Sequence, residues 1–148
     1  MTLQERLSQE IKSAMLAKDA DRLSTLRLLK SALGYLMIER KTEALSDADF
    51  IAMVQKEVKK RRDSVDQYDK GGRPELAARE KQEITVLEAF LPKALTPAEL
   101  EELVKAAIQE AAATSKKQMG AVIKLVQAQA AGRAEGKTIS EIVGRLLP

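Results

Sequence analysis

The stretch LPKALTPAEL, residues 91–100, decides how this chain is organised, because it ends one helical segment and begins another. Proline disfavours a helical conformation at the residue before it, so the preceding helix should end at Leu91. A few residues later, Thr96 and Glu99 have the spacing of a capping box, with a proline at the first helical position. The sequence therefore predicts a boundary near residues 92–95.

Helical periodicity extends in both directions from this boundary. Apolar residues recur every three or four positions, and no stretch alternates between apolar and polar residues as a half-buried strand would. The chain is therefore predicted to be all-α, with two helical modules: about four helices over residues 1–92 and three helices over residues 96–148. The second helix is expected over residues 23–40, and the others are expected to start at Thr2, Ser46, Pro74, Thr96, Ser115 and Thr138.

Two absences in the composition restrict the chemistry of this chain of 148 residues. It contains no His and no Cys, which excludes Ser-His and Cys-His nucleophile pairs, thiol redox chemistry, disulfides and zinc sites built on nitrogen or sulfur ligands. Asp63, Asp66 and Asp69 lie three residues apart, but this spacing drifts around a helix and does not gather the carboxylates at one point. We therefore predict no catalytic residue, no metal site and no cofactor.

The N-terminal segment and the distribution of charges suggest a location. The longest stretch without Asp, Glu, Lys or Arg has eight residues, whereas a membrane-spanning helix needs about 20 apolar residues. Glu5, Arg6, Glu10 and Lys12 occupy the region in which a secretory signal needs an apolar run. We therefore expect a cytoplasmic protein without membrane association.

The net charge of +3 conceals an uneven distribution of charge. Residues 96–110 hold one basic and four acidic side chains, whereas residues 111–148 hold six basic and two acidic ones, a net charge of +4. Lysine and arginine neutralise nucleic-acid phosphates with modest geometric demands, so the C-terminal end is the expected phosphate-binding region. Its basic residues are Lys116, Lys117, Lys124, Arg133, Lys137 and Arg145.

The segment GRAEGK, residues 132–137, joins the last two expected helices and has two interpretations. It could be a helix end followed by a tight turn. It could also be a phosphate site, because glycine lets the backbone approach a ligand, Arg133 and Lys137 flank it, and a helix start is expected at Thr138. Aromatic residues make up only 3% of the chain, so an RNA contact would involve backbone and shape rather than base stacking.

The densest basic run lies at residues 56–62 and also has two interpretations. It could contact phosphates. It could equally be a solvated helix face, in which Lys59 pairs with Asp63 and Arg62 pairs with Asp66 at i,i+4 spacing, which is the more frequent outcome of interleaved charges. The residues that remain candidates for RNA contact are Lys59, Lys60, Arg61 and Arg62.

Two segments of the chain resemble YqeY-like proteins. The first runs from RPELA at residues 73–77 to EITVLEAFLPKALTPAEL at residues 83–100, and the second combines SKKQMGAV at residues 115–122 with GRAEGK. The resemblance covers essentially the whole chain. It implies a four-helix N-terminal part, a three-helix C-terminal part, and kinship with the tail of the B subunit of the tRNA-dependent amidotransferase, GatB.

That amidotransferase converts Glu-tRNA(Gln) or Asp-tRNA(Asn) to the amide, and its tail helps to hold the tRNA body. The resemblance therefore implies a tRNA-binding accessory protein that contacts the RNA backbone without catalysis. Two alternatives stay open: a subunit associated with glutamine-dependent carbon–nitrogen ligase activity, acting with aminoacyl-tRNA synthetase or amidotransferase components, and a helical protein–protein adaptor. The resemblance places Lys116, Lys117, Arg133, Gly136 and Lys137 in the tRNA-facing module, and the local basic charge adds Lys124.

Overall fold

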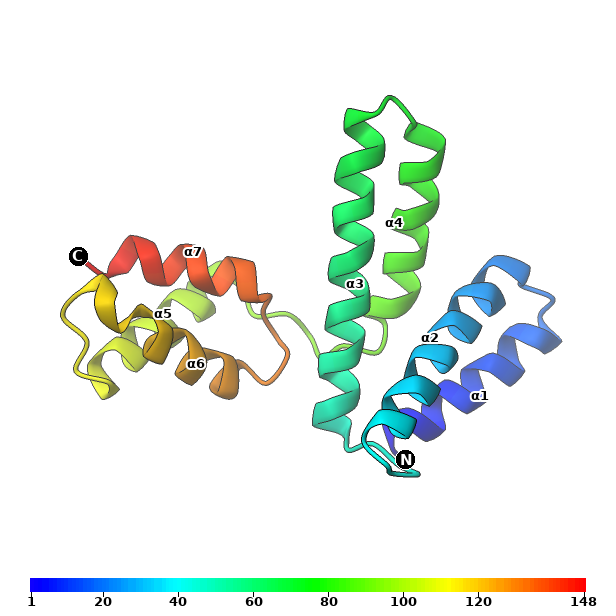
Figure 1. Ribbon diagram of the computed structural model, residues 1–148, viewed down its shortest axis with the longest axis horizontal. Coiled ribbons are helices and arrows are strands. Elements are labelled where there is room, and N and C mark those ends of the chain that lie inside the picture. The colour runs from blue at the N-terminus through cyan, green and yellow to red at the C-terminus, as the bar shows by residue number, and fades with distance from the viewer. The chain divides into compact units, whose positions relative to one another are not determined.

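The computed structural model describes all residues, Met1–Pro148, as seven α-helices and one short 3₁₀ helix without strands (Figure 1). This confirms the prediction of an all-α chain. None of the helices has the length and apolar composition that crossing a membrane requires. The elements are α1 (Leu3–Leu16), α2 (Ala20–Glu39), α3 (Asp47–Lys70), α4 (Pro74–Glu88), α5 (Pro97–Glu110), η1 (Lys116–Gln118), α6 (Met119–Ala130) and α7 (Gly136–Leu146).

The chain divides into two compact units, each with its own hydrophobic core. Unit 1 is Met1–Leu91 and contains α1 to α4, and unit 2 is Pro92–Pro148 and contains α5 to α7 with η1. α4 ends at Glu88, three residues before the predicted end at Leu91, and a turn over Ala89 and Phe90 follows it. Both Leu91 and Pro92 lie outside helices, in agreement with the disfavoured helical conformation before proline.

Side-chain caps begin three of the helices where the sequence predicts them. At the start of α5, the Thr96 hydroxyl accepts from the Glu99 N–H at 3.2 Å, and the Thr96 N–H donates to the Glu99 carboxylate at 3.0 Å. Thr2 begins α1 with the same reciprocal pair of bonds, and Ser46 begins α3 by accepting from the N–H of Asp49. Each such cap stabilises its helix by about 1 kcal/mol relative to alanine.

The starts of the last two helices differ from the prediction. Ser115 precedes the 3₁₀ turn η1, and α6 itself begins only at Met119. The start of α7 at Thr138 is wrong: the helix begins at Gly136, with Glu135 as an N-cap that makes no side-chain capping bond. The first intrahelical bond joins the N–H of Ile139 to the Glu135 carbonyl at 3.0 Å. The helix therefore begins without a side-chain cap, and Ile139, its fourth residue, is buried in the core of unit 2.

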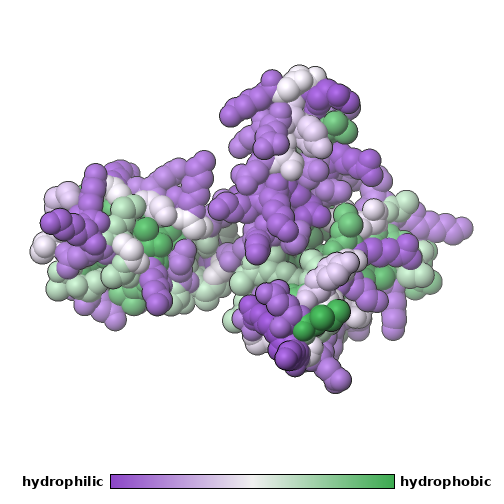
Figure 2. Space-filling model, viewed as in Figure 1, coloured by the Kyte–Doolittle hydropathy of each residue, from purple (hydrophilic) through white to green (hydrophobic).

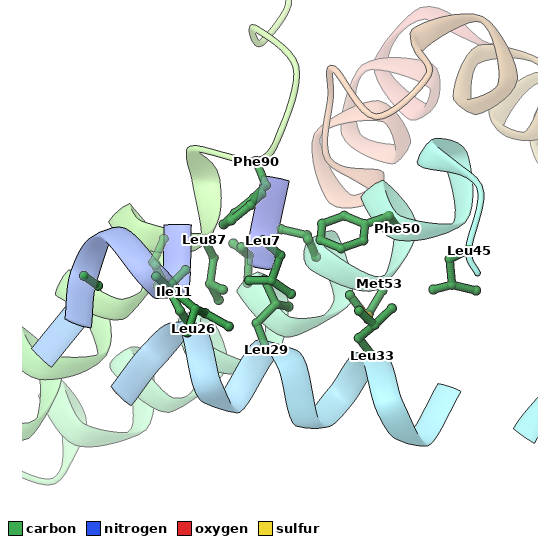
Figure 3. Packing of buried hydrophobic residues seen from close by; sticks show 14 of the residues in the cluster. Leu7, Ile11, Leu26, Leu29, Leu33, Leu45, Phe50, Met53, Leu87 and Phe90 are labelled. Carbon is green, nitrogen blue, oxygen red and sulfur yellow. The ribbon is translucent and has the colours of Figure 1, made fainter. Parts of the chain in front are cut away.

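Unit 1 consists of two helical hairpins that share one core (Figure 1). Figure 3 shows Leu26 and Leu29 of α2 pointing toward Ile11 and Leu7 of α1, and Leu33 of α2 beside Met53 of α3. The rings of Phe50 and Phe90 pack at a centroid distance of 5.8 Å, and the guanidinium of Arg6 lies 4.9 Å from the centre of the Phe90 ring. The ends of α3 and α4 are thereby joined to α1.

Unit 2 is a three-helix bundle in which α6 packs against both α5 and α7. Its buried residues recur at helical spacing on all three helices. The N–H of Leu95 donates to the Arg133 carbonyl at 2.8 Å, which attaches the start of the unit to the α6–α7 connection. The fully or almost fully buried side chains include Leu100, Val104, Val122, Val126, Ile139 and Val143.

Two glycines of unit 1 should respond to alanine substitution in opposite directions. A Cβ at Gly34, inside α2, would meet no atom within 4 Å, so Gly34→Ala should raise the free energy of unfolding by about 0.5–1 kcal/mol through helix propensity. Gly72, which follows α3, has a positive φ of +69°, so Gly72→Ala should lower the free energy of unfolding by about 1 kcal/mol. Urea unfolding followed by circular dichroism measures both changes, and a destabilised Gly34→Ala variant would contradict this account.

Candidate nucleic-acid interface

The basic candidates of unit 2 lie along α6 and beyond both of its ends. Lys116 and Lys117 are in η1 immediately before α6, and Lys124 lies in its middle. Arg133 and Lys137 follow its C-terminal end. Because α6 has 12 residues and a helix rises about 1.5 Å per residue, the two end groups are separated by roughly 18 Å. The structure thus spaces the cations along one helix and does not gather them at a single point.

The outer face of α6 is cationic and carries small residues. Lys116, Lys117 and Lys124 are exposed and pair with no carboxylate. Gly120 and Ala121 lie between the lysines and are exposed as well. We define the α6 face as Lys116, Lys117, Gly120, Ala121, Lys124 and Ala128.

The sequence does carry a signal for this face. No acidic residue occurs from Ala111 to Ala134, a stretch that contains four basic residues. The net charge of residues 111–148 does not reveal the absence of acidic residues in this stretch, because it includes Glu135 and Glu141. The small residues also carry information, because a face without long side chains allows an RNA backbone to approach the helix closely.

Arg133 is oriented by the backbone of its own unit. Its Nε–H donates to the Lys93 carbonyl at 2.9 Å, while the side chain remains exposed. Its two terminal guanidinium nitrogens donate to no protein group. This arrangement holds the guanidinium at the surface and leaves its outer edge available to an anion.

The connection between α6 and α7 is a turn in which the two glycines differ. Gly132 has φ +84° and follows Ala131, which also has a left-handed conformation, so this pair reverses the chain. Gly136 begins α7 without a positive φ, and a Cβ there would lie at an ordinary contact distance of 3.5 Å from the Gln127 amide. The backbone freedom predicted for Gly136 is therefore not used, and the Glu135 N-cap places an acidic residue at this helix start.

The two arginines of the basic run of unit 1 form ion pairs with another helix. Arg61 is only 12% exposed and bridges α3 and α4: its Nη1 lies 3.0 Å from Glu57 and its Nε 3.3 Å from Glu83. Arg62 pairs with Glu88 of α4 at 2.9 Å. Because Arg61 is enclosed and doubly paired, we remove it from the candidate RNA contacts.

The other members of this run are more exposed. Lys60 lies 3.5 Å from Glu57 on the same helix. Lys59 is exposed, and its predicted pair with Asp63 does not form. The i,i+4 rule considers a single helix, so it could not show that Glu83 and Glu88 of α4 are partners of this run.

Several carboxylates surround the single guanidinium of Arg61: Glu57, Glu80 and Glu83. Burial raises the pKa of Glu80, and the negative charge of Glu83 raises it further, while Arg61 acts in the opposite direction. A carboxyl group with a raised pKa is held in the fold at a cost when it is ionised.

Glu80→Gln should therefore stabilise unit 1 at neutral pH, by about half a kcal/mol or less because the site is near the surface. The gain should be complete above the folded pKa of Glu80 and should disappear below the ordinary glutamate pKa of 4.5, where the parent carboxyl is protonated in both states. Thermal unfolding of parent and variant between pH 4 and pH 8 measures the difference. The exposed Glu43→Gln serves as control, and a Glu80→Gln gain that grows as the pH falls would contradict the assignment.

No group of three or more His, Cys, Asp and Glu side chains is arranged to hold a metal ion. An open cavity of about 300 Å³ lies between α2 and α4 of unit 1. Its lining is polar and includes Arg79 and Glu83, but Glu83 already pairs with Arg61. The Thr25 hydroxyl in this lining donates to the Asp21 carbonyl at 3.2 Å. Because these lining groups are engaged within the fold, the basic surface of unit 2 is the stronger candidate site.

Comparison with known proteins gives a family and a small set of relatives. Residues 4–147 match the family model described as Yqey-like protein. Three relatives are each named altered inheritance of mitochondria protein 41, mitochondrial. The protein from Eremothecium gossypii is 34% identical over 66% of this chain and 52% of its own length. The one from Vanderwaltozyma polyspora is 31% identical over 57% of this chain and 46% of its own length.

The third relative, from Pyrenophora tritici-repentis, is 27% identical over 94% of this chain and 80% of its own length. The chain thus spans about half the length of the first two relatives and most of the third. The matches place the chain in one family and name no ligand.

The names of these relatives overturn the cytoplasmic prediction, because they describe mitochondrial proteins. The prediction was wrong in its logic as well as in its outcome. Charged residues near the N-terminus argue against the apolar core of a secretory signal, but they do not distinguish the cytoplasm from the interior of an organelle.

Proposed function

The chain belongs to the Yqey-like protein family, and we propose that it is an accessory protein that holds the backbone of tRNA on the basic surface of unit 2 and catalyses no reaction itself. The observation that carries this proposal is the α6 face, with three exposed lysines that pair with no carboxylate. Unpaired surface lysines can neutralise phosphates, and this neutralisation releases the counterions that are condensed on the nucleic acid.

The composition of unit 2 supports contact with the backbone rather than with bases. All four aromatic residues, Tyr35, Phe50, Tyr68 and Phe90, belong to unit 1. Unit 2 therefore has no ring on which a base could stack, and its cations would read the shape and charge of a folded RNA.

The proposed contacts have an order of importance. Lys116, Lys117 and Lys124 form the centre of the surface because they share the α6 face. Arg133 and Lys137 extend it at the other end of the helix, where Arg133 is already oriented by the Lys93 carbonyl. The basic run of unit 1 is left out, since two of its four candidates bridge to α4.

Of the alternatives raised by the sequence, participation in amide transfer has no arrangement of residues in its favour. The adaptor alternative is favoured by exposed apolar side chains on a different helix, α2.

The proposal predicts how binding of a labelled tRNA depends on salt. Lys117→Gln/Lys124→Gln should weaken binding, and it should reduce the slope of log K against log salt by roughly two, because about one counterion is released per phosphate contact. Fluorescence anisotropy between about 50 and about 200 mM salt covers the range in which this effect is large.

The matched control is Lys56→Gln/Lys59→Gln, which removes the same charge from exposed positions of unit 1. It should leave the slope nearly unchanged. An equal loss in both variants would indicate a general effect of net charge, and the absence of tRNA binding by the parent at low salt would exclude the proposal. A single-stranded RNA of equal length should bind more weakly than tRNA if folded shape is recognised.

A further inference from the structure

The large hydrophobic side chains that remain exposed are confined to one part of the molecule. All six belong to the N-terminus, α1 or α2, and none belongs to α3, α4 or unit 2. Figure 2 shows hydrophobic surface gathered over the α1–α2 hairpin, while most of the surface of α3 and α4 is hydrophilic. The six are Met1, Met15, Leu16, Leu28, Tyr35 and Ile38.

Three of these side chains form a stripe along the outer side of α2. Leu28 is 51% exposed, and Tyr35 and Ile38 are each 76% exposed. Together with Ser24 and Ser31, they follow the alternating steps of four and three residues that define the a and d positions of a coiled coil. The opposite side of α2 is buried in the core, so this helix has two apolar stripes and uses only one of them within the chain.

The stripe also has the recesses that helix docking requires. In a coiled coil, each side chain of one helix enters a hole formed by residues i, i+3, i+4 and i+7 of the other. An open, shallow cavity of about 350 Å³ lies on α2, and its lining contains such a set together with Ala20 and Leu23. The set is Ser24, Arg27, Leu28 and Ser31.

A second hole follows one heptad later, at Ser31, Gly34, Tyr35 and Ile38. Gly34 lowers the wall of this hole, and it has no packing role in the chain's own fold, since a Cβ there would meet nothing within 4 Å. A glycine inside a helix costs about 1 kcal/mol relative to alanine. Close approach of another helix would account for its presence.

Charge indicates what kind of helix fits. Arg27 lies at the g position beside the stripe, and Lys30 lies one turn further along at the outer c position on the same side of the helix. Both are exposed and pair with no carboxylate. Arg22 and Arg40, elsewhere on this helix and at its end, are by contrast paired with Glu10 and Asp49. The flank thus offers two free cations to a partner that carries acidic residues.

A second copy of the chain supplies no such complement. An antiparallel copy would bring Asp21 close to Glu39 of the other chain, which places like charges together. A parallel copy would place Arg27 opposite Ala32. Neither arrangement pairs the free cations.

We propose that the outer stripe of α2 docks an amphipathic helix of another protein, whose flank facing Arg27 and Lys30 carries Asp or Glu. Side chains of that helix enter the two successive holes, and its acidic flank pairs with the two cations. This interaction does not depend on RNA binding by unit 2, and it makes the chain an adaptor in addition.

A synthetic peptide tests the chemistry of the partner without requiring its identity. The probe is a labelled helix of about 21 residues with Leu at a and d and Glu at e and g, since repulsion between the glutamates keeps it from pairing with itself. A matched peptide with Lys at e and g is the comparison. Fluorescence anisotropy with the full chain should show that the acidic peptide binds and that the basic peptide binds at least about tenfold more weakly.

Two variants of the chain locate the site. Leu28→Ser/Ile38→Ser should weaken binding of the acidic peptide at least about tenfold, because it removes the apolar contacts of both holes. Arg27→Glu/Lys30→Glu should reverse the preference toward the basic peptide. Leu16→Ser, which removes an 86% exposed leucine outside the stripe, should leave binding unchanged. All substituted side chains are exposed, so circular dichroism should report an unaltered fold.

Four results would overturn the proposal. Equal binding of both peptides, or failure of the charge reversal, would exclude acidic complementarity. Sedimentation velocity showing a dimer of the parent that Leu28→Ser/Ile38→Ser abolishes would assign the stripe to a second copy. Binding to phosphatidylglycerol vesicles that the same variant abolishes, with no peptide binding, would assign it to a lipid surface.

Discussion

A helix in a small bundle can bury only the side that meets its neighbours. This constraint determines what is exposed on the α6 face and on the outer stripe of α2. Each unit assembles its own core from one stripe per helix, and whatever lies on the opposite side of the helix meets solvent. On α6 the outward side carries lysines separated by small residues, whereas on α2 it carries Leu28, Tyr35 and Ile38. The same packing rule thus presents a cationic surface on one unit and a partly apolar stripe on the other.

Ion pairing divides the basic residues into arginines that stabilise the fold and lysines that remain free at the surface. In unit 1, five arginines of α1 to α3 pair with acidic side chains: Arg6 and Arg22 with Glu10, Arg40 with Asp49, Arg61 with Glu57 and Glu83, and Arg62 with Glu88. Arginine suits this role because its guanidinium makes several directed bonds at once. The three lysines of the α6 face have no such partners. Nearly equal numbers of charges in the whole chain therefore give surfaces of different character.

Two surfaces on separate units suit a protein that acts through binding. Neither surface needs a nucleophile, a metal or a cofactor, which agrees with a composition that contains no His and no Cys. Backbone contacts to RNA are individually weak and depend strongly on salt, and a docked helix buries a modest apolar area. Engagement of both surfaces by one assembly would raise the effective affinity of each through their covalent connection.

The sequence by itself determined the helical class, the break at Leu91 and Pro92, and the capped starts at Thr2, Ser46 and Thr96. These features depend on groups within about four residues of each other, and such interactions can be seen in a linear pattern. Only the tertiary structure decided that Arg61 belongs to a bridge between α3 and α4 and that α7 starts at Gly136 rather than at Thr138. The physical reason is that ion pairing and burial depend on distances between helices, which the spacing of residues along one helix does not contain.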